Sequence, residues 1–195
     1  MYNKFNLTHT NPMNWEEFNS IVSDIIDKLK TYQKENNIKF DITSPVLRSG
    51  GVPAVIIANK LQIVDMSPVQ IKCTTEGVKI KTKPAIPIGI NADAPLNILV
   101  IETNTCTGKS AKKALSALKQ TYPNSKFYYV SVCKVYESPN IIEGYENYTY
   151  GIISDDSCKL TKSEAIEKNI RYGITIFPWE TAEFELAQMN NNASS

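Results

Sequence analysis

The sequence predicts an α/β fold with a mainly parallel central sheet flanked by helices. Two apolar runs, Asn97–Ile101 and Phe127–Cys133, have the length and continuous hydrophobicity of buried parallel strands. Between them, apolar residues from Ala111 to Leu118 recur at helical spacing. A strand, a turn, a helix and a second strand in this order are typical of a parallel sheet with crossover helices.

Composition and charge narrow the class of protein. The chain has 195 residues, 42% of them hydrophobic and 21% charged, which suits one globular domain with a full core. A net charge of +1 gives no electrostatic footprint for nucleic acid or an anionic membrane. The four cysteines are widely separated, there is one histidine, and the first residues are polar. We therefore expect a cytoplasmic protein that acts on a small molecule, without a zinc site or a signal segment.

The N-terminal half begins with an amphipathic helix. Its predicted range is Asn14–Lys30, capped by Asn14 with Glu17 as the partner in a capping box. The next element is a strand over Asp41–Leu47, which leads into a glycine-containing turn. A second helix follows to Leu61, because Pro53 is well placed in a first helical turn.

The other elements are predicted from shorter patterns. Residues 64–65 and 69–73 are strand-like, and residues 74–96 contain several prolines and basic residues, which suggests a hairpin or a mobile flap. Near the C-terminus, Ile174–Phe177 is strand-like and Thr181–Met189 is helical. Residues 190–195 are too polar to pack, so we expect a disordered tail.

The segment Cys106–Ser110 (CTGKS) joins the first apolar strand to the next helix. At such a junction, outward-pointing N–H groups and the helix dipole attract anions, and the Thr107 and Ser110 hydroxyls add donors. Lys109 in the first helical turn opposes the dipole unless an anion is bound there. The segment therefore predicts a phosphate-binding loop.

Two other interpretations apply to the same segment. A Walker A loop has the pattern Gly-x-x-x-x-Gly-Lys-Ser/Thr, but its first glycine would fall on Thr103. The pattern therefore disfavours a nucleoside triphosphatase. An ordinary capped helix start remains an open alternative.

The segment ILVIETNTCTGKSA, residues 98–111, resembles the phosphoribosyl pyrophosphate (PRPP) motif of the type I phosphoribosyltransferases. In that family an apolar strand leads into two acidic residues, a short spacer and Thr-Gly-x-Thr/Ser. Residues 46–54 (VLRSGGVPA) resemble the family's pyrophosphate loop, and Arg48 and Pro53 keep its spacing.

Three further segments extend the resemblance to the purine branch of the family. Residues 15–17 (WEE) resemble the first helix of microbial members, and Lys134 matches the lysine that reads the purine 6-oxo group. Residues 177–180 (FPWE) resemble the C-terminal signature of the xanthine/guanine and hypoxanthine subfamily. The five motifs occur in the family's order from Trp15 to Glu180.

This resemblance implies a type I phosphoribosyltransferase fold over residues 1–189. It implies a flap over about residues 74–96 and a small hood from about residues 136–180 plus the N-terminal segment. It also implies transfer of the 5-phosphoribosyl group from PRPP to a purine-type base, giving a nucleoside monophosphate and pyrophosphate in purine salvage. Mg²⁺ and a homodimer or homotetramer follow from the same resemblance.

The implied site has four parts. The resemblance assigns the 5′-phosphate to Cys106, Thr107, Gly108, Lys109 and Ser110. It assigns pyrophosphate to Arg48, Ser49 and Gly50, and the base to Lys134, Ile174 and Trp179. Catalytic positions fall on Glu102, Thr103 and Cys106, with Glu102 near Mg²⁺ through water or ribose.

Plainer roles stay open for several of these residues. Arg48 suits a surface ion pair, and Lys134 suits a solvated strand end. Trp179 suits the core or a subunit contact, and we interpret His9 as an ordinary surface residue.

Four positions depart from the family pattern. Ser49 replaces a glycine, and Ile174 replaces the aromatic residue that stacks on the base. Thr103 replaces the second acid of the motif, and Cys106 replaces the aspartate near purine N7. A thiol has a reference pKa of about 8.5, which the helix N-terminus and Lys109 could lower, and it does not replicate an aspartate. Two hypotheses therefore stay open: an active transferase, and a PRPP- or nucleotide-binding regulatory protein of the same fold.

Overall fold

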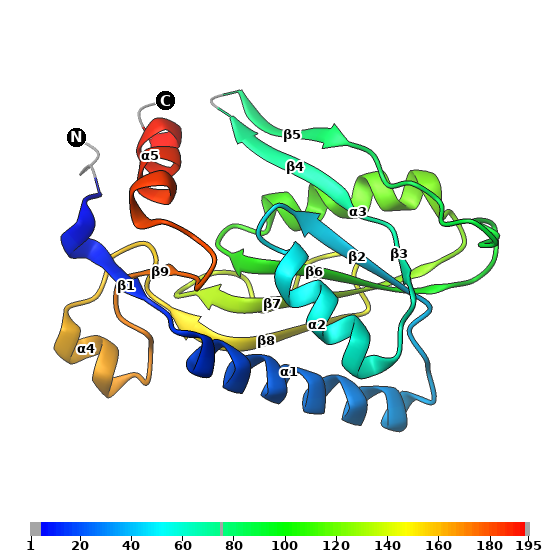
Figure 1. Cartoon of the computed structure of the whole chain (residues 1–195), viewed down its shortest axis with the longest axis horizontal. Coiled ribbons are helices and arrows are strands. Elements are labelled where there is room, and N and C mark those ends of the chain that lie inside the picture. The colour runs from blue at the N-terminus through cyan, green and yellow to red at the C-terminus, as the bar shows by residue number, and fades with distance from the viewer. Residues whose placement is uncertain (1–4, 75, 194–195) are drawn as a thin grey trace.

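The computed structural model describes residues 5–74 and 76–193 and confirms the α/β fold with a mostly parallel central sheet (Figure 1). The main sheet has the strand order β5-β4-β2-β6-β7-β8, with β3 paired to β2. Its pairs are parallel except for β4 with β5, which is antiparallel. Its strands are β2 (Ile42–Leu47), β3 (Asp65–Met66), β4 (Val69–Thr74), β5 (Gly77–Thr82), β6 (Asn97–Thr105), β7 (Lys126–Val135) and β8 (Asn147–Ser154).

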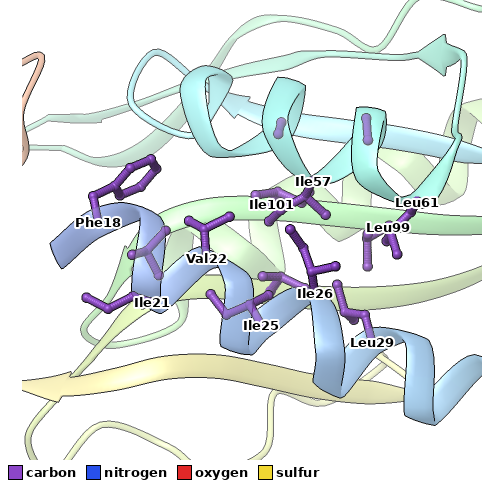
Figure 2. Close-up of a cluster of buried hydrophobic side chains, with 14 of the residues drawn as sticks. Phe18, Ile21, Val22, Ile25, Ile26, Leu29, Ile57, Leu61, Leu99 and Ile101 are labelled. Carbon is purple, nitrogen blue, oxygen red and sulfur yellow. The ribbon is translucent and has the colours of Figure 1, made fainter. Parts of the chain in front are cut away.

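Helices cover both faces of this sheet. On one face lie α1 (Trp15–Asn36) and α2 (Gly51–Leu61), whose apolar side chains meet those of β6, as Figure 2 shows. Alternate residues of β6 point to the two faces, so Leu99 packs beneath α1 and α2 whereas Val100 packs beneath α3 (Lys109–Thr121). The sheet is therefore buried on both sides, which explains the apolar runs from which it was predicted.

The predicted elements differ from the structure mainly at their ends. Asn14 caps α1 as predicted, but the helix continues to Asn36. The carboxylate of Glu17 pairs with Arg171 and takes no part in a capping box. The flap prediction corresponds partly to the β4–β5 hairpin, which begins earlier, at Val69, and is followed by a loop over residues 83–96.

A second, two-stranded parallel sheet joins the two ends of the chain. In it β1 (Thr10–Pro12) pairs with β9 (Ile174–Ile176), beside the 3-10 helix η1 (Leu7–His9), α4 (Lys162–Glu167) and α5 (Ala182–Ala193). The predicted disordered tail is wrong for residues 190–193, which are helical. The Asn190 side chain there exchanges two hydrogen bonds of 2.9 Å with the backbone of Phe5. Residues 194–195 of that tail lie outside the described residues.

The described helices also bear on membrane association. Over residues 5–74 and 76–193, none of them combines the length and the apolar character needed to span a bilayer.

Candidate active site

The carboxyl ends of β2 and β6 lie side by side because the two strands are parallel neighbours. β2 runs into the turn Arg48–Gly50, and β6 runs into the loop Cys106–Gly108 that precedes α3. The predicted pyrophosphate turn and the predicted phosphate loop therefore meet at one edge of the sheet. Ligands of open α/β sheets bind at this kind of edge.

The turn after β2 lies directly against the backbone of β6. A Cβ atom at Gly50 would come within 2.5 Å of the Ile101 carbonyl oxygen and 2.6 Å of the Val46 carbonyl oxygen. Glycine is therefore required at this position by close approach of the backbone. Two residues that depart from the family pattern reinforce this contact, because the Thr103 hydroxyl donates a 2.8 Å hydrogen bond to the Ser49 hydroxyl.

Glu102 lies in the second half of β6, three residues before Thr105, and contributes to the cleft described below. Its Oε2 accepts a short hydrogen bond from the hydroxyl of Tyr129 on β7, and that hydroxyl also lies 3.0 Å from the Thr105 hydroxyl. Burial raises the pKa of Glu102 to about 7, and the hydrogen bond from Tyr129 opposes that rise. The floor of the site thus holds a carboxyl group whose ionisation falls near neutral pH.

The predicted phosphate loop has one residue in a left-handed conformation and one residue lining the cleft. Gly108 precedes α3 with φ of +70°, a conformation that other residues adopt only with strain. Ser110 lines the cleft, whereas Cys106, Thr107 and Lys109 are exposed beside it.

The helix N-terminus and Lys109 do not lower the pKa of the Cys106 thiol below its ordinary value. Partial burial raises the pKa of this thiol, and the negative charge of Asp156 raises it further, while Lys159 opposes the rise. Asp156 is half-buried: its Oδ2 accepts a 2.8 Å hydrogen bond from Asn104, and desolvation raises its pKa to about 6. The thiol is therefore favoured over the thiolate, and a carboxyl group from another segment lies in its neighbourhood.

A cleft of about 700 Å³ lies at this edge of the sheet. Its floor is formed by the ends of β2 and β6, and its two walls come from the β4–β5 hairpin and from the C-terminal segment that ends in α5. The volume is within the range of small-molecule sites. Charged groups line it on every side: Arg48, Lys72, Lys81, Glu102, Glu180 and Glu185.

The hairpin wall presents two lysines to the cleft. Gln70 pairs with Thr82 whereas Ile71 pairs with Ile80, so Lys81 is the extra residue of a β-bulge. A bulge turns a side chain away from the regular alternation, and Lys81 lines the cleft together with Lys72 of β4.

The opposite wall is one face of the α5 segment. Thr181, Phe184, Glu185 and Gln188 line the cleft, and their spacing of three and four residues places them on one side of a helix. Glu185 lies 3.9 Å from the Arg48 guanidinium, which also sits 4.8 Å from the centre of the Phe184 ring. The ion-pair alternative for Arg48 thus describes a real contact, made inside the cleft.

The three residues predicted to bind the base are not brought together. Lys134 is only 5% exposed and lies over the ring of Tyr150, so it is not a solvated strand end, and it does not line the cleft. Ile174 is buried in the small cluster of the second sheet. Trp179 lines the cleft with part of its surface, while its ring stacks on Phe177 at 5.1 Å. The core interpretation of Trp179 therefore accounts for most of its contacts.

Several site residues were missed in the sequence. Glu180 follows the FPWE tryptophan immediately, and burial together with the charges of Glu185 and Asp156 raises its pKa to about 7. The alternation of lysines in residues 79–83 was a signal for the hairpin wall. Tyr129 gave no signal of its own, because its contact with Glu102 crosses between two strands.

The residues at the floor do not fit a magnesium ion held by the protein alone. Glu102 offers one carboxyl group with a raised pKa, and the second acid of the motif is Thr103, whose hydroxyl bonds to Ser49. In the described part of the chain, no three His, Cys, Asp or Glu side chains are grouped so that they could hold a metal ion. Mg²⁺ prefers several oxygen ligands and usually binds with substrate phosphates.

Comparison with known proteins supports the fold. No protein-family model and no curated protein matches the sequence. Among solved structures, a purine phosphoribosyltransferase from Pyrococcus horikoshii matches with a TM-score of 0.62 and 15% identity, over 89% of this chain and 95% of that one. A xanthine-guanine-hypoxanthine phosphoribosyltransferase from Helicobacter pylori matches with a TM-score of 0.59 and 16% identity, over 92% and 99%. A hypothetical protein from Neisseria gonorrhoeae with bound ppGpp matches with a TM-score of 0.60 and 13% identity, over 96% and 98%.

The chain therefore has the phosphoribosyltransferase fold of type I, as its motifs predicted. The two named enzymes among these structural neighbours are purine phosphoribosyltransferases.

Proposed function

We propose that the protein is a phosphoribosyltransferase that joins the 5-phosphoribosyl group of PRPP to a purine-type base. The observation that carries the proposal is the meeting of the Arg48 turn and the Ser110 end of the phosphate loop around one cleft, with Glu102 on its floor. This is the arrangement that a ligand with phosphate groups at both ends of a ribose requires.

In this proposal each part of the cleft has a task. The backbone around Gly108 and the start of α3 hold the 5′-phosphate, and Arg48 holds the pyrophosphate. Glu102 lies where the ribose hydroxyls fall, and an ionised carboxylate there favours the positive charge that develops on the ribose ring. The bond from C1 to the pyrophosphate oxygen breaks, and a bond from C1 to a base nitrogen forms. Holding both partners in line supplies much of the rate.

The purine preference rests on the structural neighbours. Lys134 of β7 matches the family's base-reading lysine in sequence, but its side chain lies over Tyr150 outside the cleft and adds no support. Magnesium enters this proposal as part of the substrate, the Mg²⁺ complex of PRPP. We also propose a cytoplasmic location, supported by four free cysteines, and a homo-oligomer by analogy with the family.

A second candidate function is a protein of this fold that binds PRPP or a nucleotide without turnover. Three features favour it: Glu102 is engaged by Tyr129, Thr103 is engaged by Ser49, and the thiol of Cys106 has a raised pKa. The bond to Tyr129 occupies one oxygen of the remaining acid, and Thr103 and the Cys106 thiol stand, uncharged, where the family's motif places acidic residues.

Base-dependent release of pyrophosphate tests the two candidates. The protein is incubated with PRPP, Mg²⁺ and, in turn, hypoxanthine, xanthine, guanine and adenine. Release with one of these bases supports the transferase. Saturable PRPP binding without release supports the second candidate, and absence of binding contradicts both.

Gly108→Val is the matched binding test. A β-branched residue strains the positive φ of the phosphate loop, so PRPP binding should be lost. Gly89→Val is the control, because Gly89 also has a positive φ and has no neighbour within 4 Å of its Cβ position. Equal loss of binding in both variants would contradict the assignment of the phosphate.

A further inference from the structure

The hydroxyl of Tyr129 lies between two parts of the candidate site. It is within hydrogen-bond distance of Glu102 Oε2 and of the Thr105 hydroxyl, 3.0 Å away. A phenol has one proton, and here it is donated to the Glu102 carboxylate, so the Thr105 hydroxyl must donate to the Tyr129 oxygen. The result is a directed chain of hydrogen bonds from Thr105 through Tyr129 to Glu102.

The ring that carries this hydroxyl has little freedom to move. Tyr129 is only 1% exposed, and its ring lies 5.1 Å from the ring of Tyr145 and 5.1 Å from that of Tyr148. Tyr145 is fixed in turn by a 2.8 Å hydrogen bond from its hydroxyl to the Ala111 carbonyl oxygen of α3. Burial raises the pKa of Tyr129 well above its ordinary value, so its proton stays in place for donation.

The two ends of the chain of hydrogen bonds are the two places where a ligand would be held. Glu102 lines the cleft, and Thr105 is the residue before the loop Cys106–Ser110. The bond to Tyr129 uses Oε2, and among the described residues no hydrogen bond to Glu102 Oε1 is present. One carboxyl oxygen is thus anchored in the interior while the other remains for a ligand in the cleft.

We infer that Tyr129 is a positioning residue that orients Glu102 toward the ribose hydroxyls of the ligand. The inference rests on the proposed function, which places ribose beside Glu102. Tyr129 compensates in part for the acid that is missing at Thr103, because it fixes the remaining carboxyl group from beneath. The ligand class that needs this orientation is a sugar phosphate with free ring hydroxyls; inorganic phosphate does not need it.

The test compares two probes, ribose 5-phosphate and inorganic phosphate, by isothermal titration calorimetry. In Tyr129→Phe the ring packing remains and only the hydroxyl is lost. We expect binding of ribose 5-phosphate to weaken about tenfold, the loss of a hydrogen bond to a charged group, and binding of phosphate to stay within about twofold.

The matched control is Tyr128→Phe. Tyr128 is the neighbouring residue, is 4% exposed, and its hydroxyl donates a 3.1 Å hydrogen bond to Asn97 Oδ1 at the far end of β6. This variant also loses one tyrosine hydroxyl but should bind both probes like the wild type. Glu102→Ala should weaken ribose 5-phosphate binding, and Tyr129→Phe added to it should cause no further loss, because Tyr129 acts through Glu102.

The outcomes separate the role of Tyr129 from the assignment of ribose to Glu102. Equal weakening of both probes in Tyr129→Phe, or an additional loss in the double variant, would mean that Tyr129 only supports the loop, and the inference would be overturned. Unchanged binding of ribose 5-phosphate in Tyr129→Phe overturns the inference alone. If the wild type binds ribose 5-phosphate no more tightly than phosphate, the ribose assignment fails, and the proposed function and this inference fall together.

Discussion

The floor and the walls of the cleft are held in place by different means. On the floor, Thr103 bonds to Ser49 and Glu102 bonds to Tyr129, and these contacts lie within or against the buried sheet. The walls depend on side chains in contact with water, such as the pair of Arg48 with Glu185, whose side chains are 67% and 28% exposed. Buried hydrogen bonds are costly to break, whereas exposed ion pairs contribute little. The floor is therefore preorganised, and the walls are free to adjust to a ligand.

The largest effect that this comparison predicts is on stability, from a change in the floor. Gly50→Ala places a methyl group within 2.5 Å of the Ile101 carbonyl oxygen, so the turn or β6 must shift. Overpacking of this kind should lower the free energy of unfolding by about 3 kcal/mol, measured by urea denaturation.

The adjacent glycine is the matched control for that prediction. A Cβ atom at Gly51 would meet only the flexible Leu47 Cδ2, at 3.3 Å, and Gly51 begins α2. Gly51→Ala should therefore change stability by less than about 1 kcal/mol. Similar losses of unfolding free energy in both variants would contradict the close packing of Gly50 against the backbone of β6.

A change in the hairpin wall should act on binding and leave stability unchanged. Lys81→Ala removes a positive charge that the β-bulge turns into the cleft. Binding of inorganic pyrophosphate should weaken about tenfold, since a charge-assisted hydrogen bond is lost, while the melting temperature stays within about 2 °C.

Lys79→Ala is the control for the hairpin. Lys79 lies two residues away on β5 and pairs with Glu76 outside the cleft. The Lys79→Ala variant should bind pyrophosphate as tightly as the wild type does. If the two variants lose affinity equally, the general positive charge of the hairpin is responsible and the bulge has no special role.

The sequence predicted the interior of the protein better than its site. The strands around Leu99 and Val130 were predicted because both faces of the sheet are buried and the strands are therefore uniformly apolar. β8 was missed because its residues, NYTYGIIS, are mostly half-buried and carry hydroxyls, which removes both the apolar run and the alternation. Helical residues 190–193 were missed because the Asn190 contact with Phe5 is tertiary and leaves no local pattern.

In the candidate site, too, features with a local sequence pattern were predicted better than features that depend on tertiary contacts. Arg48 and Ser110 were predicted from the characteristic spacing of their loops, and both line the cleft. Lys134 was placed by its position after an apolar strand, but its side chain lies over the ring of Tyr150 and does not line the cleft. Side-chain direction at the end of a strand depends on its neighbours, and a single sequence does not contain that information.

The raised pKa of Glu180 predicts a smaller effect, on the pH dependence of stability. The ordinary pKa of this carboxyl group is 4.5, and in the folded protein it is about 7, so the folded state binds the proton more tightly. The free energy of unfolding should therefore fall as pH rises from about 4.5 to about 7.

Glu180→Gln isolates this contribution, since the amide oxygen still accepts the hydrogen bond from the Phe177 N–H but does not titrate. We expect the difference in melting temperature, variant minus wild type, to be a few degrees larger at pH 7.5 than at pH 5. Glu183→Gln, at an exposed position of α5, should show the same difference from the wild type at both pH values. A pH-independent shift for Glu180→Gln would contradict the raised pKa of the Glu180 carboxyl group.

The smallest predicted effect is a gain of affinity from a change in the α5 wall. Glu185 presents its carboxylate to Arg48 at 3.9 Å, at the place where the proposed function puts pyrophosphate. Glu185→Gln removes this competing negative charge, so pyrophosphate should bind about twofold more tightly at low ionic strength, and the gain should vanish in high salt. Calorimetric titrations at two salt concentrations measure it, with Glu183→Gln as the control on the same helix. Weaker binding in Glu185→Gln would mean that the contact orients Arg48 for the ligand, and the α5 wall would then belong with the preorganised floor.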